Sequence, residues 1–233
     1  MGGGRMLGKP LVCDAGATLA DAVAGPDFLR IGEAAFALDP LSSSGVQKAV
    51  ATALQAASVV NTILRRPGDG ALALRFFEEE QGDTVLRHAQ WTASVYADCR
   101  HSAEPFWSER SQGAAAEEPA APRPGPGAAL RLADEAGIAQ VATLTGDFVE
   151  ARPALVHPGL GRPIAFVAGA SLPPLLEGLG GTRGQIEARL AARLPAQASR
   201  SLVERLIACG ALVDEAVPAA AGRRAGRGAG CGP

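Results

Sequence analysis

Apolar residues recur at helical spacing over one long stretch, from Ser44 to Arg66. The positions that carry this pattern are Val46, Ala49, Val50, Ala53, Leu54, Ala57, Val60 and Leu64. Val59 and Ile63 widen the apolar stripe, and no charged residue follows Lys48 until Arg65. The pattern predicts an α-helix that is buried nearly all round.

Local signals predict where this helix begins and ends. Ser43 or Ser44 is a candidate N-cap, because a serine hydroxyl accepts a hydrogen bond from a free N–H of the first turn. Arg65 and Arg66 oppose the helix dipole at the other end, where Pro67-Gly68 stops the helix. A short apolar strand at 28–31 precedes the helix, followed by a turn at 32–33 and a bend at Asp39-Pro40.

The next segments read as helical. Residues 69–99 predict one or two amphipathic helices, and Gly82 leaves the number open. Within them, residues 78–80 are three glutamates that form a solvated acidic face. Residues 101–112 carry Phe106 and Trp107, which we expect to pack back on the same domain.

The second half has a different pattern. Residues 128–136 predict a helix, and 141–156 alternate loosely, which indicates strands around a turn at 145–147. Residues 163–168 predict an apolar strand. Three helices then follow at 172–179, 182–194 and 198–209, with Gly210 as a C-cap and a closing strand at 211–214. Helices followed by a short edge strand resemble a winged-helix-like module.

These elements predict four regions. Residues 1–112 form a first domain, and 113–127 are a linker rich in Pro, Ala and Gly that buries too little apolar surface to fold alone. Residues 128–217 form a small winged-helix-like α+β domain, and 218–233 are a disordered tail.

Composition excludes several classes of protein. The chain has 233 residues, of which 47% are hydrophobic, and a net charge of −2, so it carries no global nucleic-acid footprint. The four cysteines and three histidines lack ligand-type spacing, which argues against a metal site. Scattered cysteines suit the cytoplasm. The start of the chain lacks the long apolar run of a signal peptide, and the most apolar helix is better interpreted as a buried core helix than as a membrane span.

Two stretches, Ile31–Ala35 and Leu38–Ala49, carry a resemblance to a known family. They are similar to the second FAD motif of the flavoprotein monooxygenase and halogenase superfamily, a Gly-acid turn, an Asp-Pro bend and a Ser-x-Gly helix start. The version here looks like that of the flavin-dependent maturases of tryptophylquinone enzymes, which are tryptophan-halogenase-like flavoproteins. The resemblance is stronger over 10–110 than over 128–215.

The resemblance implies a fold and a cofactor site. The fold would be α/β, mainly α here: the C-terminal part of a glutathione-reductase-like FAD-binding fold, followed by the winged-helix-like domain. Glu33, after Gly32, takes the place of the usual Asp that holds a ribose or ribityl hydroxyl. Pro40 would pass close to the isoalloxazine ring. The free N–H groups near Ser44, Gly45 and Val46 would face the flavin N1–C2=O edge, which becomes negative on reduction.

One family feature is absent. The GxGxxG motif that binds the dinucleotide end has no counterpart, because Gly2-Gly3-Gly4 follows no strand. We therefore expect a C-terminal part that binds FAD weakly or not at all by itself and lacks an N-terminal flavoprotein half. The implied activity is that of a monooxygenase or halogenase-like oxidoreductase acting on a protein-borne aromatic side chain, with a protein or peptide substrate. The alternatives are a non-catalytic protein- or peptide-binding module and an inactive remnant.

No catalytic residue is assigned from the sequence. Lys48 reads as a solvated lysine in the first turn of the helix rather than as a catalytic group. His88 and His101 read as packing or surface residues, because no acid or nucleophile pairs with them at a diagnostic spacing.

Overall fold

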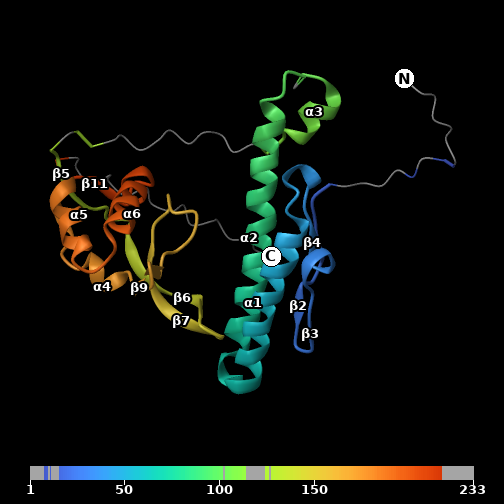
Figure 1. Ribbon diagram of the computed structural model, residues 1–233, viewed down its shortest axis with the longest axis horizontal. Coiled ribbons are helices and arrows are strands. Elements are labelled where there is room, and N and C mark those ends of the chain that lie inside the picture. Colours follow the sequence, from blue (N-terminus) through green and yellow to red (C-terminus); the bar gives the residue numbers. More distant parts are fainter. Residues whose placement is uncertain are drawn as a thin grey trace, which may run out of the picture. The chain divides into compact units, whose positions relative to one another are not determined.

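The computed structural model describes residues 8, 9, 11, 16–101, 103–113, 124, 125 and 127–216. The chain divides into two compact units (Figure 1). The first comprises Met1–Glu118 together with Ala142–Glu150, and the second comprises Pro119–Val141 together with Ala151–Pro233. Each unit has its own apolar core, and each is described separately below.

Two long helices dominate the first unit. Helix α1 spans Gly45–Arg65 and packs alongside α2, which spans Gly70–Ala97 (Figure 1). The sequence predicted α1 and left open whether one or two helices follow it. The structure shows one, because α2 is continuous through Gly82. The 3-10 turn η3, Pro67–Asp69, joins them, so the Pro-Gly stop acts where it was predicted. A short helix α3, Pro105–Arg110, follows, and its Trp107 ring contacts Tyr96 of α2.

Short antiparallel ribbons and two 3-10 turns precede α1. Strand β1 (Thr18–Leu19) pairs with β4 (Phe36–Ala37), and β2 (Ala24–Gly25) pairs with β3 (Phe28–Leu29). The 3-10 turns are η1, Gly32–Ala34, and η2, Pro40–Ser42. The predicted strand at 28–31 is therefore shorter than its apolar run, because the chain turns at η1.

The core of the first unit forms between these ribbons and one face of each helix. Its buried members include Phe36, Val59, Ala73, Phe77 and Val149. Val149 belongs to β7 (Phe148–Val156), which pairs with β6 (Gly137–Thr145). Full burial of a side chain such as Phe77 contributes about 1.5–3 kcal/mol, so these few residues hold α1 and α2 together.

The prediction that α1 is buried nearly all round is wrong. One stripe of its apolar side chains is exposed, with Val46 at 81%, Leu54 at 66% and Leu64 at 73%. Val50, Ala57 and Val60 on the same side of the helix are exposed as well. We call these six residues the α1 stripe. Periodicity shows that a helix is apolar on most sides, but it does not show how many of those sides have a partner in the described chain.

The second unit combines a three-stranded antiparallel sheet with two packed helices. The sheet order is β10–β5–β11, with β5 at Ala129–Leu132, β10 at Gly180–Thr182 and β11 at Leu212–Asp214. Helices α5 (Arg183–Ala191) and α6 (Ala196–Ala208) pack against each other. The predicted closing strand, and Gly210 in the left-handed conformation after α6, are confirmed.

Two predictions for this unit need correction. The segment 128–136 is not helical but contains the central strand β5, because Leu130 is buried between two neighbouring strands. The Ala and Leu content that suggested a helix also suits a buried strand. The helix predicted at 172–179 is shorter in the structure, where α4 spans Pro173–Leu176. The strand predicted at 163–168 is also shorter: β8 spans Phe166–Val167 and pairs with β9, Ala170–Ser171.

Candidate functional site

The segment Gly32–Lys48 carries every residue that the sequence proposed for a cofactor. It begins at Gly32, whose φ of +57° is a left-handed conformation that favours glycine. A Cβ at this position would lie 3.3 Å from the Cβ of Ala49. The Gly32 N–H donates to Oγ1 of Thr52 at 2.9 Å. Gly32 therefore lets η1 pass close to α1, and this packing alone accounts for a glycine there.

Glu33 forms an ion pair with Lys48. The distance from Lys48 Nζ to Glu33 Oε1 is 2.5 Å, and Nζ also donates to the Phe36 carbonyl at 2.8 Å. The Lys48 ammonium lies 4.9 Å from the centre of the Phe36 ring. The interpretation of Lys48 as a solvated lysine is wrong, because η1 and β4 fold over the first turns of α1 and bury it.

The Asp-Pro bend is a 3-10 turn capped by its own aspartate. Asp39 Oδ1 accepts from the Leu41 N–H at 2.9 Å, and Pro40 occupies the first position of η2. Asp39 Oδ2 accepts from the hydroxyl of Tyr96 at 2.8 Å. Desolvation and this hydrogen bond to Asp39 raise the pKa of Tyr96 above its usual 10.0. Tyr96 thus fixes the bend from α2.

A second contact joins the same turn to α2. His88 Nε2 lies 2.9 Å from Ser42 Oγ, and Ser42 Oγ lies 2.6 Å from Ser44 Oγ. The His88 ring also meets Trp91 edge-on at 5.7 Å. The sequence-based interpretation found no partner for His88, whereas the fold brings it to a serine 46 residues away.

The first turn of α1 is open. Gly45, Val46 and Gln47 are exposed, and no hydrogen-bond acceptor for their N–H groups lies within the described part of the chain. A Cβ added to Gly45 would meet nothing within 4 Å. Ser44 occupies the N-cap position, as predicted, but its hydroxyl makes no capping hydrogen bond. Helix N-termini with free N–H groups favour electron-rich or anionic ligands.

The fold gathers the predicted residues into one place. Gly32 and Glu33 lie in η1, Pro40 lies in η2, and Ser44, Gly45 and Val46 begin α1, with η1 packed against α1. The residues that sequence reasoning missed are His88 and Tyr96. The sequence did contain a signal that these side chains share one face of a helix, because His88, Thr92 and Tyr96 follow each other at four-residue intervals.

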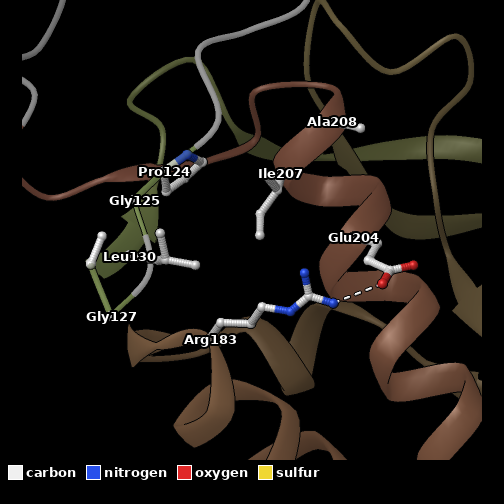
Figure 2. A pocket seen from close by; sticks show the side chains of 9 residues that line it. Pro124, Gly125, Gly127, Leu130, Arg183, Glu204, Ile207 and Ala208 are labelled. Carbon is white, nitrogen blue, oxygen red and sulfur yellow. Dashed lines mark hydrogen bonds and ion pairs between the residues drawn. The ribbon is translucent and has the colours of Figure 1, made fainter.

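A separate cavity lies in the second unit. It has a volume of about 590 Å³ and is lined by Leu130, Ile207 and Ala208 together with the ion-paired Arg183 and Glu204 (Figure 2). None of the residues from Gly32 to Lys48 lines it. The Arg183 guanidinium forms ion pairs with Glu187 and Glu204, each at 2.7 Å. These two hydrogen-bonded carboxylates raise the pKa of Arg183.

No group of three or more His, Cys, Asp or Glu residues in the described part of the chain could hold a metal ion. Within that same part, no helix combines the length and apolarity needed to cross a bilayer.

Comparison with known proteins gives the chain's relationships. No protein-family model matches it. Over 86 residues, which are 37% of the chain, the sequence is 36% identical to tryptophan 2-halogenase of Chondromyces crocatus, and the match covers 16% of that protein.

Two solved structures share the fold. The first is the peptidyl tryptophan dihydroxylase QhpG, essential for tryptophylquinone cofactor biogenesis, with a TM-score of 0.59 and 27% identity over 83% of this chain and 43% of that one. The second is the flavin-dependent halogenase CmlS, with a TM-score of 0.61 and 16% identity over 84% of this chain and 46% of that one. The chain thus spans less than half the length of either structure.

These matches confirm the resemblance to the tryptophan-halogenase-like flavoproteins.

Proposed function

We propose that this chain supplies the isoalloxazine-facing half of the flavin site of an FAD-dependent oxidoreductase. The observation that carries the proposal is the open first turn of α1, where three consecutive N–H groups have no acceptor in the described part of the chain. The chain's relationship to flavin-dependent halogenases and to a tryptophan dihydroxylase supports it.

The residues present fit such a cofactor. Gly45 and Val46 would donate backbone N–H groups to the electron-rich edge of the ring, and Gly45 has no Cβ to hold the ring away. Pro40, in the capped turn η2, would line the ring. Oε1 of Glu33 accepts a hydrogen bond from Lys48, whereas Oε2 has no hydrogen-bond partner among the described residues. Oε2 would therefore accept a hydrogen bond from a cofactor hydroxyl.

The same proposal gives the chemistry. When bound, FAD supplies the exchange of electrons between a reductant and dioxygen. The chain's own residues would position the ring through the first turn of α1, and the dipole of this 21-residue helix favours the negative charge of the reduced ring. The activity would be that of a monooxygenase or halogenase-like enzyme. QhpG acts on a peptidyl tryptophan, which supports a protein-borne aromatic side chain as the substrate here.

The missing half of the flavin site would come from a second flavoprotein segment, and the α1 stripe is where it would dock. Among the described residues, exposed Val46, Leu54 and Leu64 form an uncovered apolar face on a helix whose opposite face is in the core. Burial of apolar surface is worth about 25 cal/mol per Å², so covering this face favours association. The solved relatives contain more than twice the matched length, which supports a segment of that fold as the occupant.

For the organisation of the chain, we propose a first domain at 1–112, a linker at 113–127, a winged-helix-like α+β domain at 128–217 and a tail at 218–233. The pair α5–α6 beside the sheet β10–β5–β11 supports the winged-helix-like interpretation. Residues 142–150 belong to the first compact unit.

Reconstitution tests the proposal. The full chain is co-expressed with an N-terminal Rossmann segment of a tryptophan-halogenase-like flavoprotein, and the purified material is assayed for bound flavin by absorbance. We expect co-purification of the two polypeptides with FAD and little flavin on the chain alone. The proposal fails if the complex forms and contains no more flavin than the Rossmann segment by itself.

A second candidate function is protein or peptide binding by the second unit. The observation in its favour is an independent core, with Leu155, Ile186 and Leu206 among its buried members. Capture of a protein partner by the full chain that is retained without residues 1–112 would support it, and loss of capture on that deletion would count against it.

A further inference from the structure

The cavity of the second unit has walls that are mainly apolar. Leu130 of β5, which is 2% exposed, and Ile207 of α6 face each other across it (Figure 2). Its volume of about 590 Å³ lies within the range of about 300–1,000 Å³ that is typical of pockets for small ligands. Apolar walls stabilise a ligand by removing its apolar surface from water. The cavity is therefore large enough and apolar enough to hold an aliphatic or aromatic group.

Two glycines keep the cavity open on the side where the chain enters β5. Gly125 and Gly127 line the cavity, and a Cβ built at either position would meet nothing within 4 Å. The Ala128 N–H donates to the Gly125 carbonyl at 3.1 Å, which closes a turn around them. Gly127 has a φ of +83°, a conformation in which a side chain would be strained. These two residues thus form wall without filling the space.

One edge of the cavity is polar and offers a donor beside an acceptor. Arg183 donates through Nε to Glu187 and through Nη2 to Glu204, at 2.7 Å in each case. Its Nη1 has no hydrogen-bond partner among the described residues and points toward Ile207 (Figure 2). Glu204 accepts through Oε1, and its Oε2 has no partner in the described part of the chain. Nη1 and Oε2 are therefore left to a ligand.

The charges at this edge select against an ionised ligand. The guanidinium of Arg183 faces the carboxylates of Glu187 and Glu204, so one negative charge is in excess and an anion is repelled. A cation that approaches Glu204 Oε2 meets the Arg183 guanidinium. A neutral amide avoids both repulsions, because its C=O can accept from Nη1 while its N–H donates to Oε2. Hydrogen bonds to charged groups of this kind are stronger than those between neutral groups.

We propose that this cavity is a binding site for a neutral ligand that joins an apolar group to an amide. The apolar group lies between Leu130 and Ile207, and the amide pairs with Arg183 and Glu204. An apolar residue within a peptide and a small free amide share this chemistry. The cavity contains none of the residues assigned to the flavin, so the inference goes beyond the proposed flavin site and gives the second unit a ligand of its own.

Methyl NMR of the full chain tests the site without any flavin. The probe is 4-methylpentanamide, titrated while the methyl signals of Leu130 and Ile207 are followed. We expect saturable shifts of both signals. The control compound 4-methylpentanoate has a carboxylate in place of the amide and should bind about tenfold more weakly, because it loses the N–H donor and gains a repelled charge. Absence of a saturable shift, or equal binding of the two compounds, overturns the proposal.

Two pairs of variants separate the apolar wall from the polar edge. Ile207→Trp places a larger side chain in the cavity and should abolish saturable binding, followed at Leu130. Ile138→Trp makes the same change at an exposed isoleucine of this unit that does not line the cavity, and it should leave binding unchanged. Arg183→Leu removes the donor and should weaken binding of the amide about tenfold. Arg200→Leu, at an exposed arginine away from the cavity, is its matched control.

Methyl signals of the buried residues Ile186 and Leu206 report whether each variant keeps the core of the second unit. Unchanged binding in Ile207→Trp with this core intact overturns the site. Unchanged binding in Arg183→Leu overturns it as well, and this variant decides the matter if Ile207→Trp does not fold.

A blocked tripeptide, N-acetyl-Gly-Leu-Gly-amide, distinguishes the two sources of the ligand. Tighter binding of this tripeptide than of 4-methylpentanamide supports the site with a peptide as its ligand, and equal binding supports it with a small amide. None of these measurements involves flavin. A failed flavin reconstitution therefore leaves the amide site standing, and a failed amide titration leaves the flavin site standing.

Discussion

The ammonium group of Lys48 lies 2.5 Å from the carboxylate of Glu33, although the two side chains sit in different environments. The Lys48 side chain is 3% exposed and that of Glu33 is 71% exposed. Lys48 therefore depends on Glu33 and on the Phe36 carbonyl for compensation of a buried charge, whereas water stabilises Glu33.

This asymmetry predicts an unequal response to substitution. Glu33→Ala leaves a buried ammonium without its counter-charge, and we expect a loss of about 1–2 kcal/mol in the free energy of unfolding, less than for a fully buried pair because water reaches the carboxylate. Adding Lys48→Met to Glu33→Ala should recover part of that loss, because it removes the uncompensated charge.

Both tryptophans of the chain, Trp91 and Trp107, lie in the first unit, so urea unfolding followed by tryptophan fluorescence reports on that unit. Asp83→Ala, which removes one member of the exposed Arg87–Asp83 pair, is the control and should cost less than about 0.5 kcal/mol. A double variant less stable than Glu33→Ala would contradict the assignment of Lys48 as the dependent partner.

Two glycines of the motif should respond in opposite ways. Gly32→Ala places a Cβ in a left-handed conformation and against Ala49, so we expect a loss of about 1–2 kcal/mol in the free energy of unfolding. Gly45→Ala meets open space in the first turn of α1 and should leave stability equal or up to about 1 kcal/mol higher. In the reconstituted complex, Gly45→Ala should nevertheless weaken flavin binding. Equal stability losses in the two variants would contradict these roles.

If the α1 stripe is the docking surface, a substitution in it should weaken association with the Rossmann segment without lowering the free energy of unfolding. Leu54→Glu changes an exposed side chain, so we expect it to alter the free energy of unfolding by less than about 0.5 kcal/mol and to abolish co-purification with the Rossmann segment. Val59→Ala, one position off the stripe in the core, should cost about 2 kcal/mol and leave association intact. Retained association in Leu54→Glu, measured by size-exclusion chromatography, would rule out the stripe as the interface.

His88 gives a prediction for pH dependence. Desolvation lowers the pKa of His88 below its usual 6.5, Asp39 opposes the shift and Lys48 adds to it. The unfolded chain therefore binds the proton more readily, so stability is fully present above pH 6.5 and declines as the pH falls from there through the lower folded pKa. His88→Gln should flatten this decline. An NMR titration of the His88 imidazole would refute the prediction if His88 titrated at or above 6.5.

Much of the local structure followed from the sequence. Apolar spacing and the Pro67-Gly68 stop defined α1 and its end, because each depends on residues within a few positions of one another. The strands around the turn at 145–147 and the position of Ser44 at the N-cap were found in the same way. The segment Gly32–Lys48 also identified the flavoprotein relationship, since the motif is contiguous in the chain.

The tertiary structure decided which of those residues have partners. Lys48 is buried because Glu33 and Phe36 fold over it, and His88 of α2 contacts the Ser42 hydroxyl, 46 residues away in the chain. Segment 128–136 is a strand because two other strands flank it, and α1 has an exposed apolar stripe because nothing in the described chain covers that face. These outcomes depend on contacts between residues far apart in the chain, and the periodicity of a single segment contains no information about them.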